Sequence, residues 1–205
     1  MKNRFYAFIR FFCLSGALVM IPIQAPQAFD KNRLRHGAVI YMRYCSGCHA
    51  LKYMRFGRMT HDLGLSTKQE LHHSLQCSLP KRDAIHWFGQ MPPDLSLVAR
   101  ARNPDWIKAY LMGFYPDNTR PFGVNNTLVS GSLMPDVLAP LKERVKAGER
   151  RQQDLDDTVQ DVVSFLVYVA EPASLIRYRI GLFVIIFLLF FGFLFYLLKP
   201  NNADK

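Results

Sequence analysis

Two cysteines followed directly by a histidine, in the string Cys45-Ser46-Gly47-Cys48-His49, constrain the fold of this chain more than any other stretch. Three kinds of site use such residues: structural zinc, a redox dithiol and a covalently attached haem. A structural zinc site needs four ligands, usually as two spaced pairs, and the sequence has no second pair. A redox dithiol normally accompanies a βαβ pattern, which the sequence also lacks.

The haem interpretation accounts for both cysteines and the histidine together. Two thiols at this spacing can form thioethers to the two vinyl groups of one haem, and the adjacent imidazole then reaches the iron from the same side. C-x-x-C-H is the attachment signature of c-type haem. The sequence therefore predicts one haem c, held covalently by Cys45 and Cys48, with His49 as an iron ligand. Cys77 is left over, and we expect it to be a small buried apolar residue.

The amino-terminal residues 1–28 have the layout of a cleaved signal peptide. A basic start that includes Lys2 and Arg4 precedes a mostly apolar run from Phe11 to Ile23, and small residues lead to Ala28. We expect cleavage after Ala28 and export of the segment that follows. A short membrane anchor is the alternative interpretation. Export favours haem c, because it takes the chain to the compartment where bacteria attach this cofactor.

The carboxy-terminal part contains nineteen consecutive uncharged residues, from Ile180 to Leu198. As an α-helix this stretch would be about 28 Å long, close to the hydrocarbon thickness of a bilayer. The sequence predicts a transmembrane anchor helix over 177–199 and a short cytoplasmic tail over 200–205. We therefore expect a single-pass protein of the bacterial inner membrane, with an exported domain over 29–176 on the periplasmic side and a cytoplasmic carboxy terminus.

The basic net charge of +10 belongs mostly to the two ends of the chain. Residues 29–176 contain 19 Lys and Arg against 15 Asp and Glu, which leaves a net charge of only +4. Such a mild excess is ordinary for an exported domain and gives no reason to expect nucleic acid as a partner.

The exported domain is predicted to be mostly α-helical, the class of a c-type cytochrome haem domain with long loops. Apolar residues recur at helical spacing over 30–45, 103–115 and 154–172. Asn103 is a candidate N-cap with Pro104 at the first helical position, and Pro172 is expected to end the last helix. Segments 50–90 and 116–135 are rich in turn formers, so we expect an irregular stretch and a long loop there.

The sixth iron ligand is expected to be a methionine, because His/Met ligation gives c-type haem a raised reduction potential. Met134 and Met91 both precede a proline and lie in predicted loops. Met134 is favoured, because it lies far from His49 in the sequence and ends a long loop that could wrap around the haem. Met91 is the alternative.

Several longer strings resemble the cytochrome c1 family, the haem subunits of the quinol:cytochrome c oxidoreductase or cytochrome bc1 complex, of proteobacterial type. They are RHGAVIYMRYCSGCHALKYMRF (35–56), a string that begins WFGQMPPDLSLVARARNPDWIKAY (87–110), and LMPDVL (133–138). The most specific parts are Pro-Pro-Asp-Leu-Ser at 92–96 and Met-Pro at 134–135. The resemblance covers nearly the whole chain after the predicted signal peptide.

The resemblance implies roles for particular residues. The family's two iron ligands correspond to His49 and Met134, and its propionate-binding arginine corresponds to Arg102, whose planar fork suits a carboxylate. An aromatic donor in the next helix would be Trp106, and Pro93 would pack rigidly against the haem edge. Asp136 departs from the family pattern, because many relatives have histidine at this position.

Gly37 has two interpretations. It could be a close-contact point between the first helix and the helix at 154–171, where Phe165 or Tyr168 would pack. It could equally be a helix-weakening glycine without a role.

The resemblance further implies one-electron transfer. The haem would accept electrons from the Rieske iron-sulfur protein and donate them to a cytochrome c, beside cytochrome b in a dimeric membrane complex. The chain would then transform no substrate on its own. The alternatives are a haem enzyme with an open iron site, such as a peroxidase, and a membrane-anchored c-type cytochrome of another respiratory or nitrogen-oxide reductase system.

Overall fold

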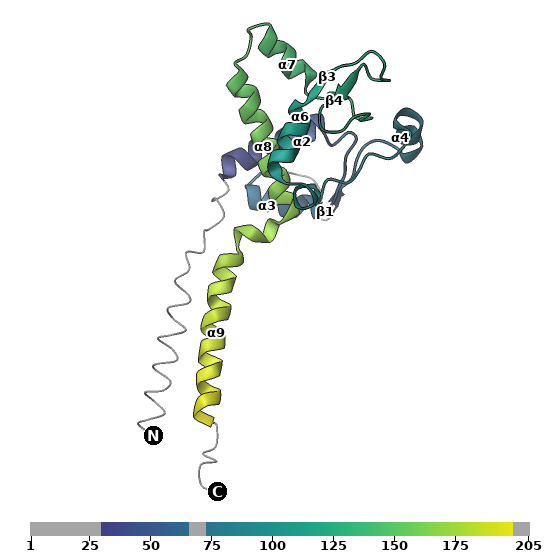
Figure 1. Ribbon diagram of the computed structural model, residues 1–205. Coiled ribbons are helices and arrows are strands. Elements are labelled where there is room, and N and C mark those ends of the chain that lie inside the picture. The colour runs from purple at the N-terminus through teal and green to yellow at the C-terminus, as the bar shows by residue number, and fades with distance from the viewer. Residues whose placement is uncertain (1–29, 66–72, 199–205) are drawn as a thin grey trace. The chain divides into compact units, whose positions relative to one another are not determined.

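The computed structural model describes residues 30–65 and 73–198, and this part of the chain is mostly helical (Figure 1). The helices are α2 (Lys31–Tyr44), α3 (Phe56–Leu63), α4 (Lys81–Phe88), α5 (Val98–Ala101), α6 (Pro104–Met112), α7 (Ala139–Lys146), α8 (Gln152–Ala170), the 3-10 helix η1 (Pro172–Leu175) and α9 (Arg177–Leu198). The strands are β1 (Leu51–Arg55), β2 (Ser74–Leu75), β3 (Phe114–Pro116) and β4 (Val124–Asn126). The predicted signal peptide and cytoplasmic tail lie outside the described residues.

The chain divides into two compact units. One unit is Phe29–Arg177, and it contains the cysteine pair together with every described helix and strand except α9. The other includes α9 from Tyr178 onward.

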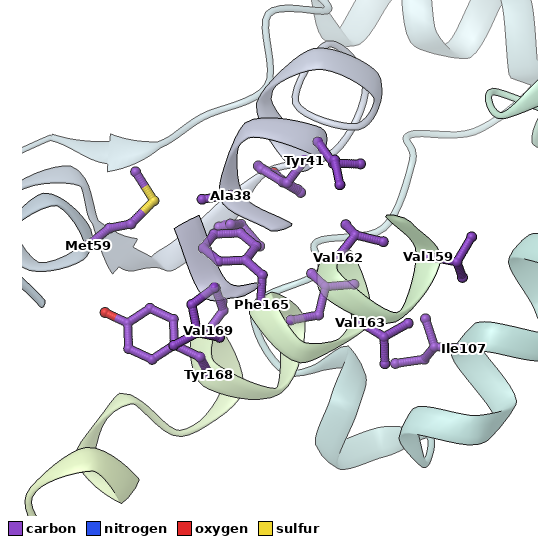
Figure 2. Close-up of a cluster of buried hydrophobic side chains, with 14 of the residues drawn as sticks. Ala38, Tyr41, Met59, Ile107, Val159, Val162, Val163, Phe165, Tyr168 and Val169 are labelled. Atoms are coloured by element: carbon purple, nitrogen blue, oxygen red, sulfur yellow. The ribbon is translucent and has the colours of Figure 1, made fainter. Parts of the chain in front are cut away.

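Helices α2 and α8 form the centre of the first unit, where they lie side by side (Figure 1). The buried face of α8 includes Leu155, Val159, Val162, Val163, Phe165, Leu166, Tyr168 and Val169. Figure 2 shows Phe165 and Tyr168 gathered near Ala38 of α2, while Ile107 of α6 lies beside Val163. The amphipathic pattern that predicted this helix therefore reflects burial against two other helices.

Gly37 allows α2 and α8 to approach closely. A Cβ atom at this position would lie 2.1 Å from the backbone oxygen of Asp161 and 2.8 Å from the Cβ of Phe165. The close-contact interpretation of Gly37 is therefore confirmed, and the interpretation without a role is wrong. Phe165 is the partner at the contact, and its ring lies 5.7 Å from that of Tyr41.

Polar bonds fasten this crossing at its surface. Asp161 of α8 accepts a hydrogen bond from Arg33 Nε at 2.8 Å and is paired with His36 Nδ1 at 2.7 Å. Near the other end of α8, the buried hydroxyl of Tyr168 donates to Asp62 Oδ2 of α3 at 2.8 Å. Asp62 also accepts from Arg58 Nε at 2.7 Å. Both carboxylates thus hold α8 against its neighbours.

The three predicted helices are present, and the predicted N-cap of α6 is confirmed. Asp30 caps α2 by accepting from Asn32 N at 2.9 Å, and Asn103 caps α6 by accepting from Trp106 N at 2.6 Å. Helix α8 ends at Ala170, before Pro172, as the sequence predicts.

The prediction that residues 50–90 are irregular is wrong, because β1, α3, β2 and α4 lie in this stretch. Gly64 and Gly89, which resemble chain breaks in the sequence, are each the C-cap of a short helix in the left-handed conformation, with φ of 62° and 69°. The predicted loop at 116–135 has no helix, but β4 within it pairs with β3, Phe114 opposite Asn126.

The predicted transmembrane anchor over 177–199 is also wrong. Helix α9 is present, but among the described residues no helix is long and apolar enough to cross a membrane. The mostly α-helical class is thus confirmed, whereas the membrane-spanning character predicted for α9 is not.

Candidate functional site

The cysteine pair and the histidine lie in a tight turn at the end of α2. Cys45 is the C-cap residue of this helix, and its N–H donates to Tyr41 O at 2.9 Å. The N–H groups of Cys48 and His49 both donate to the carbonyl oxygen of Cys45, at 3.1 and 2.8 Å. The helix and the turn therefore fix all three side chains relative to one another.

The ring of His49 is oriented by a backbone carbonyl. Nδ1 of His49 lies 2.7 Å from the oxygen of Pro93. A carbonyl can only accept, so Nδ1 carries the proton and Nε2 keeps its lone pair for a metal. Burial lowers the pKa of His49, although the Pro93 bond and the charge of Asp94 act in the opposite direction. The side chain is therefore a neutral imidazole of the tautomer that ligates iron.

The backbone of His49 is held as well. The hydroxyl of Tyr41, which is fully buried in α2, donates to the carbonyl oxygen of His49 at 2.7 Å. Burial is the largest of the effects that raise the pKa of Tyr41, so the hydroxyl remains a donor. Nothing in the sequence singled out this contact, because tyrosines at helical spacing are ordinarily packing residues.

The Pro-Pro-Asp-Leu-Ser segment is fastened to the residues that follow His49. Asp94 accepts from Lys52 N and from Ser96 N, both at 2.9 Å, and the buried Ser96 hydroxyl accepts from Tyr53 N at 3.1 Å. Burial would raise the pKa of Asp94, but these donors outweigh it and lower the pKa. The segment therefore presents the Pro93 carbonyl to His49. Pro93 was predicted to pack against the haem edge, and its observed contact is this hydrogen bond.

Burial disfavours ionisation of the two thiols of the motif. Burial, followed by the charge of Cys48, raises the pKa of Cys45 to about 12, and burial also raises the pKa of Cys48. Redox-active dithiols have lowered thiol pKa values, so this environment disfavours the dithiol interpretation. Cys77 is only partly buried, with its sulfur 3.6 Å from Leu79 O, and the expectation of a buried residue is corrected.

The structure brings Arg102 and Trp106 together. The guanidinium of Arg102 lies over the indole ring, 4.9 Å from its centroid. On the next turn of α6, Tyr110 stacks on Trp106 with ring centroids 5.3 Å apart. Their predicted contact with a haem propionate stays a prediction.

Met134 lies in the loop between β4 and α7, and it is half-buried. Its N–H donates to Ser132 Oγ at 3.3 Å, and that hydroxyl is 2.7 Å from the hydroxyl of Tyr110. Two residues after Met134, Asp136 forms an ion pair of 2.8 Å with Lys142 of α7. The predicted ligand loop is thereby attached to the helix that carries Trp106.

The donor set fits haem c. A histidine with Nε2 free and a methionine thioether could ligate the iron, and the two thiols could form thioethers to the haem vinyl groups. Arg120 is a further candidate for contact with the haem, although no sequence motif indicates it. Its Nη2 donates a hydrogen bond to Gly131 O at 2.8 Å. Its Nε is buried without a hydrogen-bond partner among the described residues. A buried unpaired N–H is costly, and a carboxylate such as a haem propionate would satisfy it.

Comparison with known proteins agrees with this chemistry. A model of the cytochrome c1 family matches residues 24–80 and 78–204. The chain belongs to the cytochrome c1 family. Cytochrome c1 is the haem-carrying electron-transfer subunit of the bc1 complex, in which it works with cytochrome b and the Rieske protein, and it carries a covalently bound c-type haem. The predicted family, function and cofactor are thus confirmed. In bacteria, cytochrome c1 is a membrane-associated subunit of that complex.

Three relatives illustrate the range of similarity. Cytochrome c1 of Allochromatium vinosum is 40% identical over 204 residues, which cover 84% of each chain. A protein of Nitrosomonas europaea named as an ammonia monooxygenase gamma subunit is 35% identical over 84% of this chain and 82% of its own length. Cytochrome b/c1 of Bradyrhizobium diazoefficiens is 24% identical, and the matched region is only 33% of that longer protein.

Proposed function

We propose that this chain accepts single electrons from the Rieske protein and passes them to a cytochrome c, with His49 and Met134 as the two iron ligands. When bound, haem c supplies an iron that gains and loses one electron. The observation that carries the proposal is the 2.7 Å contact between His49 Nδ1 and Pro93 O, which leaves Nε2 as the metal-binding atom. On its own the chain transforms no substrate.

Four other methionines of the described part of the chain have environments that suit a ligand less well than that of Met134. Met54 and Met59 are buried in the apolar core, with 1% and 2% of their surface exposed. Met112 packs against the same core. Met91 lies two residues before Pro93, whose carbonyl contacts His49, so it belongs to the His49 side of the site. These positions support Met134 as the ligand from the opposite side.

Arg102 and Arg120 would bind the haem propionates. Arg102 is held over Trp106, and Arg120 has a buried N–H to offer. Both guanidinium groups would pair with a carboxylate and hold the cofactor in one orientation.

The haem domain would lie on the periplasmic side, in keeping with the signal-peptide layout of residues 1–28. The assembly would be a dimer of the bc1 complex. A c-type cytochrome of another oxidoreductase system is the second candidate, because the Nitrosomonas europaea relative is named as a subunit of an ammonia monooxygenase.

Methionine ligation is tested with Met134→Leu, compared with Met91→Leu as the matched control. We expect Met134→Leu to keep its covalent haem, to lose the far-red methionine-to-iron absorption band and to have a lower reduction potential. It should also bind carbon monoxide rapidly after reduction. Met91→Leu should retain the band. A Met134→Leu protein with an unchanged band and potential would overturn the ligand assignment.

The assignment to the bc1 complex is tested by purification in mild detergent. A pyridine haemochrome spectrum should show two saturated vinyl groups on the haem, as expected for thioethers from Cys45 and Cys48. Subunit identification should find cytochrome b and the Rieske protein with the chain. Co-purification with components of a different oxidoreductase instead would favour the second candidate.

A further inference from the structure

The loop that carries Met134 is attached to α6 on both sides of the methionine. On the upstream side, Ser132 lies two residues before Met134. Its Oγ accepts from Met134 N at 3.3 Å and is 2.7 Å from the hydroxyl of Tyr110 on α6. Because Tyr110 is also stacked on Trp106, its hydroxyl has a fixed position.

On the downstream side, Asp136 lies two residues after Met134 and pairs with Lys142 at 2.8 Å. The same ammonium donates to Leu111 O at 3.2 Å, in the last turn of α6. Carbonyls there have no partner within the helix, so a cation is well placed to bind them. Lys142 also lies 5.6 Å from the centroid of the Phe114 ring. It therefore joins α7, the ligand loop and α6.

Because the ion pair between Asp136 and Lys142 is largely buried, its loss should displace the loop. The side chains of Asp136 and Lys142 are only 9% and 16% exposed. If Lys142 were removed, the Asp136 carboxylate would be left with little water and no counter-charge, which strongly destabilises a folded arrangement. The simplest relief is for the loop to move outward and hydrate Asp136, and Met134 would move with it.

We propose that Tyr110, Ser132, Asp136 and Lys142 form a two-sided bracket that positions the Met134 thioether at the iron and keeps the sixth coordination position closed. This inference rests on the proposed ligation by Met134. One attachment lies two residues before Met134 and the other two residues after it. Together they restrict the backbone of Met134 more than a single attachment could. The bracket thus reduces the conformational entropy that the loop would lose on binding the metal. All four members are positioning residues, because none of them needs to touch the haem.

The test uses the full-length protein with its haem attached and measures two quantities below the unfolding temperature: the far-red methionine-to-iron band and the fraction of reduced haem that binds carbon monoxide. For Lys142→Met we expect about a tenfold or greater rise in the population with an open sixth position. Asp136→Asn should have a smaller effect, since Lys142 keeps Leu111 O. Tyr110→Phe, which retains the stacked ring, should have the smallest effect.

Lys146→Met is the matched control, because Lys146 is an exposed lysine one turn further along α7. It should leave both quantities unchanged. The double variant Asp136→Asn with Lys142→Met removes the unpaired charge. It should therefore bind less carbon monoxide than Lys142→Met alone, whereas two merely disruptive changes would add. Lys142→Arg should restore most of the band.

The outcomes separate this inference from the proposed function. If Lys142→Met behaves like Lys146→Met while Met134→Leu opens the iron, the bracket is overturned and Met134 remains the ligand. If Met134→Leu leaves the band and carbon monoxide binding unchanged, the ligand assignment fails and the bracket fails with it. If Lys142→Met does not accumulate as a folded haem protein, Asp136→Asn and Tyr110→Phe decide, and wild-type behaviour of both would overturn the bracket.

Discussion

The crossing of α2 with α8 and the loop around Met134 hold their residues by different physical means. At the crossing, apolar side chains such as Phe165 are fully buried and the backbones approach until only a glycine fits at residue 37. Where this loop begins, the buried side chains of Asn125 and Asn126, the last residues of β4, hold the backbone in place by hydrogen bonds. His49 lies at the end of the packed region, and Met134 in the hydrogen-bonded one.

The difference implies two separable kinds of failure. Apolar packing is non-directional and extends over a whole helix, so its loss should lower the free energy of unfolding of the entire domain. A hydrogen-bonded loop depends on a few directional bonds, so the loss of one should loosen the loop while the domain stays folded.

Gly37→Ala is expected to have the largest effect. The added Cβ would lie 2.1 Å from Asp161 O. Because this oxygen belongs to the backbone of α8 and the Cβ is fixed to that of α2, the two helices must separate. We expect the free energy of unfolding of the haem protein to fall by about 3 kcal/mol in urea titrations. The far-red methionine band of the protein that remains folded should be unchanged.

Gly181→Ala is the control for this variant, because Gly181 is a helical glycine and a Cβ added there would have nothing within 4 Å. It should change stability by less than about 1 kcal/mol. A Gly37→Ala protein as stable as this control would contradict the role of the close crossing.

Asn126→Ala should come next, and it tests the hydrogen-bonded loop. The Asn126 side chain donates to Tyr110 O at 2.8 Å and accepts from Leu128 N at 2.9 Å and Val129 N at 3.3 Å. With these groups left without partners, we expect a loss of about 2 kcal/mol and, unlike Gly37→Ala, a weaker methionine band.

The exposed Asn118 provides the matched control, and Asn118→Ala should leave both the stability and the band unchanged. If Asn126→Ala lowers stability but keeps the full methionine band, the hydrogen bonds of the loop do not position the iron ligand. The proposed functional difference between the two regions would then be wrong.

Tyr168→Phe probes a polar contact inside the packed region, and its effect should be smaller, about 1 kcal/mol. Burial would raise the pKa of Asp62, but the hydrogen bonds from Arg58, Tyr168 and His61 together lower it. A lowered pKa in the folded state means that this carboxylate stabilises the fold above its ordinary range near pH 4 and that the contribution disappears as pH falls through the folded value.

We therefore expect Tyr168→Phe to lower stability at neutral pH and to reduce the loss of stability on acidification, measured by urea titration at a series of pH values. Asp62→Asn should remove that part of the acid dependence completely. If Asp62→Asn loses as much stability on acidification as the wild type does, another carboxylate is responsible for the acid dependence.

Arg102→Gln should have the smallest effect on stability, between about 0.5 and 1 kcal/mol, because it removes only an exposed contact with Trp106. Arg100→Gln, at a neighbouring exposed arginine, is the control. If Arg102 also binds a propionate, its substitution should change the haem reduction potential whereas the control should not. Equal potentials in the two variants would leave Arg102 as a stacking residue only.

Features that depend on neighbours in the sequence could be predicted. The haem-attachment string is contiguous, and α2, α6 and α8 are indicated by their periodicity, with Asn103 and Pro172 as further signals for α6 and α8. The sequence favours Met134 over Met91 as the iron ligand because it lies at the end of a turn-rich loop, and that assignment stays a prediction. Helices α3 and α4 were missed, because each is only eight residues long and its capping glycine resembles a chain break.

The partners of the site residues could not be predicted, because they are brought together only by the tertiary fold. The hydroxyl of Tyr41 meets the carbonyl of His49 because the chain turns back after α2. Pro93 meets the His49 ring across 44 positions of sequence, and Lys142 meets Asp136 only once α7 has formed. Local sequence patterns do not predict contacts between residues that are distant in the sequence.

Helix α4 belongs to an excursion that leaves the haem-attachment turn and returns to it. Leu79 N donates to Gly47 O at 3.1 Å before the helix, and Pro93 O accepts from His49 after it. The segment between Leu79 and Pro93 is held at both ends by these hydrogen bonds. Lengthening such a segment costs little loop-closure free energy. We expect the stretch between Leu79 and Pro93 to accept a grafted peptide or a fluorescent reporter without displacing the His49 imidazole. Such a variant would carry a probe of molecular recognition beside an undisturbed redox centre.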